Sequence, residues 1–512
     1  MSLTKVSYSM ITGAPVNVLD YGADSSGASD STSAIQTAIT ANSAVYIPAG
    51  TYKISAALQI RKNNFSLFGD GSGVSILKLV NGGTAVNILN VGKIDTVGAG
   101  DEPWNNINVS GLCLDGNRST NVPGAYDING WGILTAVISY SSFSDLRVIN
   151  CWVAGAGNEI NSNYNTWSNI SIENCGHDNA TYPASQGYPS FDINSSKYCS
   201  YSNIVTTGGY AGFRVLDNCW NNIIQVTINT PIYAGFLMGN QPVNSGCYGN
   251  IINVAVYGGC VNQGIVVGVK CWSNTITGAV YGATGVGVYE VENATSGLIP
   301  GGNTYTVSTS QCGQQSCLIG GNSSSWNITS KQDGGGGAVG DYYAVDVIGT
   351  YNQITANISD DDTPKVRGLA IRAAATNNSI VALQTTTLVS VFDLYDTSNT
   401  TKFPTRYSTG SSNVQFTLTL AGAWLYSYGV VPTYSKDSNG YVSVNGVVYN
   451  GTGVIATLPV GYRPATQLVF PTLGQELPAT AVVAANGEIT IGVGAADRFN
   501  LQPIRFFAGY GL

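Results

Sequence analysis

The sequence predicts an all-β solenoid, and three observations support this prediction. A triplet of aromatic residue, any residue and Asn recurs at intervals of roughly 19 to 34 residues, as in proteins whose repeats bury their apolar side by stacking. A short β-rich run follows most of these triplets. Charged residues make up only 10% of the chain and Gly 63 of its 512 residues, a composition that disfavours charged helix surfaces. The triplets are Trp104-Asn105-Asn106, Trp167-Ser168-Asn169, Tyr201-Ser202-Asn203, Trp220-Asn221-Asn222, Tyr248-Gly249-Asn250 and Trp272-Ser273-Asn274.

Stacked coils should align equivalent side chains into columns. The Asn of each triplet is expected to hydrogen-bond to backbone at a bend and to the amides above and below it. Cys219, Cys247 and Cys271 each precede the aromatic residue of a triplet, which predicts one column of small buried thiols. The ten cysteines include no CxxC pair, and His177 is the only histidine. We therefore expect no disulfide, no metal site and no cofactor.

The N-terminal part carries one helix signal, over Ser31–Thr40, with Asp30 as its N-cap. This helix lies between the segments Val16–Asp24 and Val45–Tyr52, and the second segment contains a Pro-x-Gly-x-Tyr turn. Together they resemble the entry segment of the pectin-lyase-like right-handed β-helix superfamily, in the form found in bacteriophage tailspikes. The resemblance implies a right-handed parallel β-helix, a helix that caps its N-terminal end, and a turn that opens the first coil.

The repeat pattern and the resemblance together predict four regions. Residues 1–15 are expected to attach the protein to a virion, and residues 16–395 to form the capped β-helix. Residues 396–420 are expected to be a linker between this β-helix and an antiparallel β-sandwich formed by residues 421–512. Hairpin-like strand pairs around the Asn486-Gly487 turn support the last assignment. Leu458–Pro464 resembles a segment of phage tail-fibre sandwiches, which implies trimerisation or carbohydrate binding. Insertions into the coils are expected at 115–130, 173–190 and 292–301.

A second register, in which a small residue is followed by apolar, variable and apolar positions, suggests where chemistry occurs. Side chains alternate along a strand, so the variable residue should point outward and form a column with a spacing of about 4.8 Å between coils. Gly157–Ile160, Ser190–Ile193 and Gly212–Val215 follow the pattern. Their variable residues are charged: Glu159, Asp192 and Arg214.

This column has the residue types that glycoside hydrolysis needs. Two neighbouring carboxylates raise each other's pKa, which favours one general acid beside one base or nucleophile. Glu159 and Asp192 are therefore the predicted catalytic pair, and either a retaining or an inverting spacing remains open. Arg214 would hold one carboxylate ionised or bind an acidic sugar. Five further residues are predicted to bind substrate with it, from the nearby insertion and coils: His177, Asp178, Tyr188, Tyr210 and Tyr233.

Simpler interpretations stand beside these. The three charged residues could form a surface charge ladder without catalytic function, and His177 could be an ordinary loop residue. Asp115 precedes a glycine and is typical of a turn, and Asp360–Asp362 is typical of a solvated loop or a calcium site. Glu290 and Glu292 are a second candidate carboxylate pair.

Charge and family resemblance limit the function. A net charge of −8 and a pI near 4.7 disfavour nucleic acid and anionic membranes as partners, and no apolar run is long enough to span a bilayer. Residues 1–13 lack the long apolar core typical of a secretory signal, so we expect synthesis in the bacterial host cytoplasm. The resemblance implies a homotrimer on the phage tail that binds the host's surface polysaccharide and contacts other tail or baseplate proteins through its N-terminus. Three hypotheses follow: an endo-glycoside hydrolase, a polysaccharide lyase and a non-enzymatic receptor-binding protein.

Overall fold

The computed structural model divides the chain into two compact units. It describes residues 15–83, 85–94, 101–121, 129–176, 187–239, 246–260, 262–291, 299–331, 343–360, 367–372, 375–386, 391–392, 394–396, 415–426, 431–436, 440–474, 477–493 and 498–508. The first unit comprises Met1–Gly285 and Asn293–Thr304, and the second comprises Val286–Glu292 and Tyr305–Leu512.

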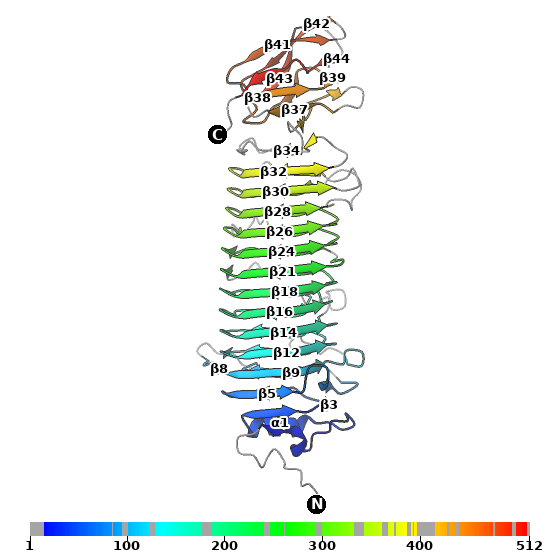
Figure 1. Cartoon of the computed structure of the whole chain (residues 1–512), viewed down its shortest axis with the longest axis vertical. Helices are drawn as coiled ribbons and strands as arrows, with labels where there is room; N and C mark the ends of the chain where they lie inside the picture. Colours follow the sequence, from blue (N-terminus) through cyan, green and yellow to red (C-terminus); the bar gives the residue numbers. More distant parts are fainter. Residues whose placement is uncertain are drawn as a thin grey trace, which may run out of the picture. The chain divides into compact units, whose positions relative to one another are not determined.

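The first unit is a parallel β-helix whose strands stack coil upon coil (Figure 1). Its longer sheet runs in the order β1 (Val16–Asn17), β2 (Ala44–Ile47), β5 (Phe65–Gly69), β9 (Ile107–Asp115), β12 (Ser142–Ile149), β14 (Thr166–Glu173), β16 (Ser200–Thr207), β18 (Ile223–Asn229), β21 (Ile251–Tyr257) and β24 (Thr275–Tyr281). β3 (Gly50–Ile54) pairs with β6 (Ser75–Leu79), which also pairs with β9. The predicted solenoid is confirmed.

A second parallel sheet of this unit carries the candidate site. Its order is β4 (Leu58–Ile60), β7 (Leu89–Gly92), β10 (Ile133–Ala136), β13 (Ala156–Glu159), β15 (Phe191–Ile193), β17 (Ala211–Val215), β19 (Ala234–Met238) and β22 (Gln263–Val267). Two short parallel pairs lie at the corners: β8 (Trp104–Asn105) with β11 (Ile138–Ser139), and β20 (Cys247–Tyr248) with β23 (Cys271–Trp272).

The core of the first unit consists of columns of like side chains. Phe191, Phe213 and Phe236 stack on consecutive coils with ring centroids 4.9 and 5.9 Å apart, and all three are fully buried. The predicted cysteine column is present, since Cys247 pairs with Cys271 and both are buried with Cys219. All ten cysteines are buried free thiols. Burial raises the pKa of several of them, including Cys219, so these thiols stay protonated and pack as small apolar groups.

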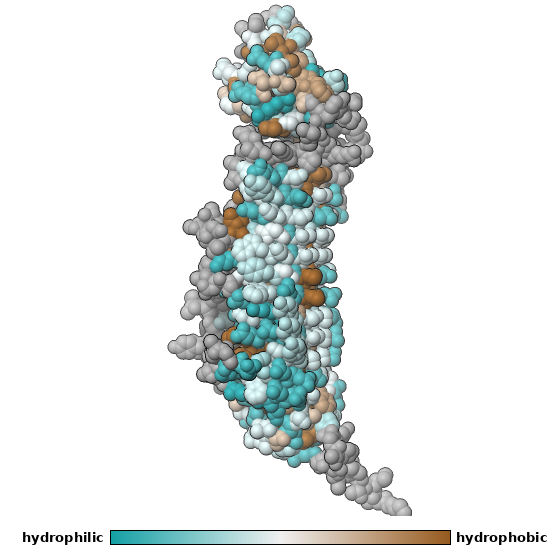
Figure 2. Space-filling model, turned by 90° about the vertical axis from the view of Figure 1, so that its left-hand side faces the viewer, coloured by the Kyte–Doolittle hydropathy of each residue, from teal (hydrophilic) through white to brown (hydrophobic). Residues whose placement is uncertain are grey.

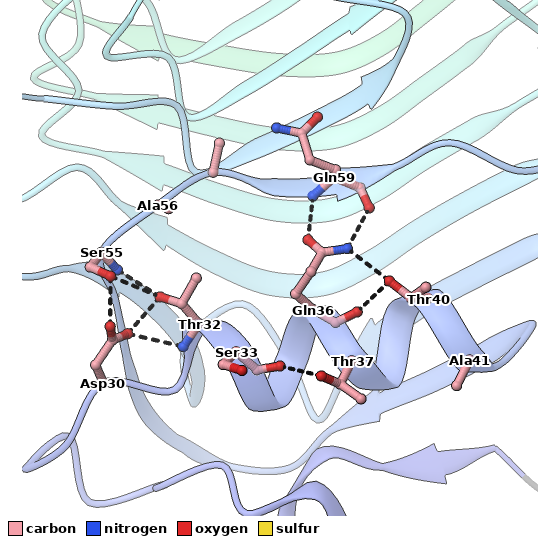
Figure 3. A pocket seen from close by; sticks show the side chains of 11 residues that line it. Asp30, Thr32, Ser33, Gln36, Thr37, Thr40, Ala41, Ser55, Ala56 and Gln59 are labelled. Carbon is pink, nitrogen blue, oxygen red and sulfur yellow. Dashed lines mark hydrogen bonds between the residues drawn. The ribbon is translucent and has the colours of Figure 1, made fainter.

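The cap helix α1 (Thr32–Ala41) begins one residue later than predicted, with Ser31 at the N-cap position. Asp30 still stabilises the first turn, because its Oδ1 accepts a hydrogen bond of 2.9 Å from the Thr32 backbone N–H. Gln36 ties the helix to the first coil: its side chain accepts from the backbone N–H of Gln59 at 2.8 Å and donates to the Gln59 carbonyl at 3.1 Å (Figure 3). The groove beside the helix is lined by polar side chains that bond to one another.

The triplets do not form one column, contrary to our prediction. Phe143, Trp167 and Tyr201 pair in register inside β12, β14 and β16, which leaves Asn169 and Asn203 exposed. The side-chain Nδ2 of Asn203 donates a hydrogen bond of 2.8 Å to Oδ1 of Asn169. A different, buried ladder contains Asn222, Asn250 and Asn274, in which each backbone N–H donates to the next side-chain oxygen at 3.0 Å. Trp104 pairs with Ile138 in a third register. Asn suits both the exposed left-handed kink and the buried corner, so one motif occurs at several places.

The second unit contains parallel strands followed by antiparallel sheets. One parallel sheet has β26 (Thr304–Ser310), β28 (Ser325–Lys331), β30 (Gln353–Asp360) and β32 (Ser379–Thr386), and another has β25 (Val288–Glu290), β27 (Cys317–Ile319), β29 (Tyr343–Val347), β31 (Arg367–Ile371) and β34 (Leu394–Asp396). The first C-terminal sheet has the order β33 (Val391–Phe392), β35 (Gln415–Thr417), β37 (Thr433–Lys436), β38 (Tyr441–Asn445) and β45 (Arg505–Phe507). The second has the order β36 (Leu425–Tyr426), β39 (Val447–Tyr449), β44 (Arg498–Asn500), β41 (Leu468–Gly474), β42 (Leu477–Val483), β43 (Glu488–Val493) and β40 (Val454–Thr457).

The change from parallel to antiparallel pairing occurs at β35, which pairs in parallel with β33 and antiparallel with β37. β35 therefore lies within the stretch 396–420 that we predicted as a linker. On the face of the molecule drawn in Figure 2, hydrophobic residues form only small patches among polar ones. No helix among the described residues is long and apolar enough to cross a membrane.

Candidate active site

The predicted column exists, but Glu159 is not a member of it. Asp192 of β15 pairs directly with Arg214 of β17, and the column continues through Leu237 and Val266. On the other side, Asp192 pairs with Gly157 and not with Glu159.

The two-residue error in register has a physical cause. Our alignment matched Asn158 with Phe191, but the coils pair Ala156 with Phe191 and Asn158 with Ile193, so Asn158 is the second inward residue of β13 and is fully buried. Asn158 accepts a hydrogen bond of 2.9 Å from Thr135 Oγ1 and donates one of 2.7 Å to the Tyr201 hydroxyl. Gly157 occupies the outward position because a Cβ there would lie 2.5 Å from the Trp131 ring. Glu159 points to the same face, two residues further along the strand.

Asp192 and Arg214 form a buried, bidentate ion pair. Arg214 Nε donates to Asp192 Oδ1 at 3.0 Å, Nη2 donates to Oδ2, and Nη1 donates to the Gly187 carbonyl at 3.3 Å. The two residues are only 2% and 8% exposed, so the charges compensate each other with little help from water. The Asp192 carboxylate raises the pKa of the Arg214 guanidinium, against the effect of its burial.

Glu159 is the titratable group of this cluster that is poised to exchange a proton. Burial and the nearby Asp192 charge raise the pKa of Glu159 to about 8, while Arg214 and a hydrogen bond with Asn194 oppose that rise. The carboxyl is therefore mostly protonated at neutral pH. Glu159 is only half-buried, and the next residue, Ile160, is exposed. A protonated carboxyl at an accessible strand end can donate a proton to a bound ligand.

Three of the predicted binding residues lie where the chain enters this sheet. The Tyr188 ring stands 5.7 Å from the Arg214 guanidinium. Tyr210 and Tyr233 stack on consecutive coils at 4.7 Å with an interplanar angle of 4°. Burial and Tyr233 raise the pKa of the Tyr210 hydroxyl. The structure thus places Tyr188 beside the Asp192–Arg214 pair, whereas Tyr210 and Tyr233 precede their strands and Glu159 lies at the other end of its strand. His177 and Asp178 lie outside the described residues.

The other sequence candidates are placed differently. Glu290 is not part of an outward pair: it is fully buried, and its Oε1 accepts hydrogen bonds from the Tyr305 hydroxyl at 2.8 Å and Ser324 Oγ at 3.0 Å. Glu292, Asp361 and Asp362 lie outside the described residues. Asp115 acts as a turn residue, accepting from the Asn117 backbone N–H at 2.9 Å. No cluster of three or more His, Cys, Asp or Glu suited to a metal occurs in the described part of the chain.

Sequence reasoning missed a second ion pair of the same kind, in the second unit. Asp346 of β29 is 2% exposed, and Arg372 donates from Nε to its Oδ1 at 2.8 Å and from Nη2 to its Oδ2. Asp346 pairs with Ala370, so Arg372 reaches it diagonally. The alternation of side chains in Tyr343–Val347 is the sequence signal that marks Asp346 as an outward residue.

Comparisons with known proteins support the fold. A family model described as rhamnogalacturonase A/epimerase, pectate lyase-like, matches residues 15–258. This match covers a little less than half of the chain, and those residues are similar to the pectate lyase-like family. The A-module of the Azotobacter vinelandii mannuronan C-5 epimerase AlgE6 has the same fold, with 16% identity, a TM-score of 0.52 and coverage of 77% of this chain and 99% of that one. The expected right-handed parallel β-helix is thereby confirmed.

Tailspikes are also among the similar structures. The Dettilon tailspike protein is 14% identical with a TM-score of 0.51, covering 95% of this chain and 91% of the other. A double mutant of the tailspike of E. coli bacteriophage HK620, in complex with a pentasaccharide, is 14% identical with a TM-score of 0.50, and the match covers 97% of both chains. These likenesses concern the fold.

Local sequence similarity relates the chain to enzymes of Azotobacter vinelandii. The chain is 41% identical over 127 residues to the mannuronan C5-epimerase AlgE3, and 32% identical over 145 residues to alginate lyase 7. The matches cover 22% and 26% of this chain but only 6% and 16% of those relatives.

Proposed function

We propose that this protein is a phage tailspike that binds a bacterial surface polysaccharide and cleaves it by hydrolysis, with Glu159 as the general acid. The observation that carries the proposal is the position of the half-buried Glu159 carboxyl, at a strand end beside the buried Asp192–Arg214 ion pair; burial and the Asp192 charge raise the pKa of Glu159 to about 8. The pectate lyase-like fold and relatives named for polysaccharide modification support the substrate class.

Each charged residue has a distinct role in this proposal. Glu159 donates its proton to the bridging oxygen, the bond from that oxygen to the anomeric carbon breaks, and water adds to that carbon and passes its extra proton to solvent. Asp192 keeps Glu159 protonated and places negative charge near the developing cation, while Arg214 holds Asp192 in position. Glu159 lies one strand across and two residues along from Asp192, which separates their Cα atoms by about 8 Å from ordinary strand dimensions. The distance that distinguishes inversion from retention is the one between the two carboxyl groups, so the anomeric configuration of the released product decides between them.

The test is depolymerisation. Purified protein would be incubated with polymannuronate and with capsular polysaccharides and lipopolysaccharides from a panel of bacterial strains, following chain length and reducing ends. Glu159→Gln should abolish shortening. Glu173→Gln is the matched control, because Glu173 lies on the other sheet and pairs with Arg147. An ultraviolet-absorbing double bond in the products would instead indicate a lyase. Shortening that survives Glu159→Gln would refute the assigned site.

A binding-only function is the second candidate, and one observation favours it. Asp192 is 2% exposed and both of its oxygens bond to Arg214, so a base or nucleophile role would require that pair to open. Polymer that binds tightly to wild type and keeps its length would establish this alternative.

The assembly implied by the resemblance is part of the same proposal. The chain would form a homotrimer and attach through residues 1–15 to another tail or baseplate protein. Light scattering of the purified protein tests the first statement. Virion incorporation after deletion of residues 1–15 tests the second, and unchanged incorporation would refute it.

A further inference from the structure

Three exposed tyrosines stack on consecutive coils beside the candidate site. Tyr140 and Tyr164 have ring centroids 4.9 Å apart with an interplanar angle of 4°, and Tyr164 and Tyr198 have values of 5.0 Å and 6°. The residues are 65%, 46% and 48% exposed. We call these three residues the tyrosine strip.

The backbone at the strip is unfavourable for tyrosine. Tyr140, Tyr164 and Tyr198 have φ values of 52°, 58° and 57°, in the left-handed region that bulky residues rarely adopt. The coils on either side fill the same position with residues that suit this conformation better, Asn106 and Asn221, both also at positive φ. Gly249 follows on the next coil. The fold therefore does not require tyrosine at these positions, and strain of this kind points to a function.

The strip and Glu159 lie on the same turns. Glu159 ends β13, and the chain passes from it to Tyr164 through Asn161, which is exposed, and Asn163. On the following coil the equivalent turn carries Lys197, whose ammonium stands 3.9 Å from the centre of the Trp220 ring. The surface between the acid and the strip thus offers amides and one cation, groups that hydrogen-bond to sugar hydroxyls.

An asparagine occupies the same corner position on the coil next to each end of the strip. Tyr198 faces the coil of Asn221, and Tyr140 faces that of Asn106, and both asparagines are exposed. An aromatic face with an amide beside it matches the apolar face and equatorial hydroxyls of a pyranose. The strip is one residue wide and has polar neighbours, so it is too narrow for the desolvated core of a stable protein interface.

We propose that Tyr140, Tyr164 and Tyr198 form a carbohydrate-binding strip that holds the polysaccharide along the coils so that one linkage lies at Glu159. This inference rests on the proposed function, because it assigns the binding surface for the same substrate. A sugar chain would follow the coils, with a pyranose against an end ring and its neighbours along the tyrosine edges and hydroxyls.

The left-handed backbone permits a test that spares the fold. Tyr140→Asn, Tyr164→Asn and Tyr198→Asn each introduce a residue that neighbouring coils already have at this position. The combined variant should melt no lower than its parent, since Asn is less strained there. Tyr257→Asn with Tyr281→Asn is the matched control: these tyrosines are 48% and 46% exposed, and β18 has Asn229 at the equivalent place.

Binding would be measured in a Glu159→Gln background, where polymer is not consumed, by titration calorimetry with polymannuronate and each polysaccharide of the panel. The triple variant should bind the positive polymer at least about tenfold more weakly, and the control should match its parent. Equal binding by the triple variant would overturn the strip while leaving cleavage by Glu159 intact. A changed oligomeric state in light scattering, with unchanged sugar affinity, would identify the strip as a protein interface instead. If the parent binds no polymer in the panel and wild type shortens none, the proposed function itself fails.

Discussion

Replacing Glu159 by Gln should make the protein more stable at alkaline pH. A folded pKa of about 8 against an ordinary value of 4.5 means that, between these two pH values, the folded state holds a proton that the unfolded state has released. The free energy of unfolding of wild type therefore falls as pH rises from 4.5 through 8. A shift of that size corresponds to at most about 5 kcal/mol, because one pKa unit is about 1.4 kcal/mol. Gln resembles the protonated side chain and escapes this loss.

The measurement is urea unfolding followed by tryptophan fluorescence at pH 4.5, 7 and 9. The midpoints of wild type and Glu159→Gln should coincide at the lowest pH and separate progressively above it, with the variant more stable. Glu173→Gln is a control of opposite sign, because the hydrogen bond from Arg147 lowers the pKa of Glu173, and removing that carboxylate cannot stabilise the protein at pH 9. Parallel curves for wild type and Glu159→Gln at all three pH values would refute the raised pKa and the assigned acid.

Three further outcomes follow from buried polar contacts. Arg214→Leu should destabilise the protein by about 3–5 kcal/mol by leaving Asp192 buried and unpaired, whereas the double replacement of both residues by Leu should restore most of that loss, as measured by denaturant midpoints. Asn250→Ala should cost about 3 kcal/mol in the same assay, because it removes hydrogen bonds to the coils on both sides. Tyr305→Phe should cost about 1–3 kcal/mol by removing a donor to buried Glu290, and a neutral effect would contradict that contact.

The fold was predictable because its signals repeat. The recurring triplets, the low charge and the entry segment all indicated stacked parallel strands, and one misread coil does not change that conclusion. The cysteine column was predictable for the same reason, since Cys219, Cys247 and Cys271 occupy one place in three successive repeats.

Register within a coil was less predictable, because it depends on which side chain enters the core. Asn158, whose amide bonds to Thr135 and Tyr201, pairs with Ile193 and not with Phe191 as we aligned it, which displaced Glu159 by two residues in our alignment. Glu290 shows the same limit: a carboxyl expected outside is inside, held by hydroxyls from other coils. Pairing across coils decides both cases, and a single strand does not contain that information.

The tyrosine strip was not predicted at all. Tyr140, Tyr164 and Tyr198 are ordinary strand-forming residues by composition, and nothing local marks them as left-handed. Only the coil-to-coil alignment with Asn106 and Asn221 shows that they occupy a corner position.

That corner position recurs once per coil with a backbone shape that hardly changes from Asn106 to Ser273. The side chains at this position are therefore evenly spaced, and the distance between consecutive coils sets their separation. A ligand with its own repeat would be selected by length as well as by composition, since each further sugar would contact the corner side chain of the next coil. Substitutions at this one position would then change the length and identity of the preferred oligosaccharide, while the coils themselves stay unchanged.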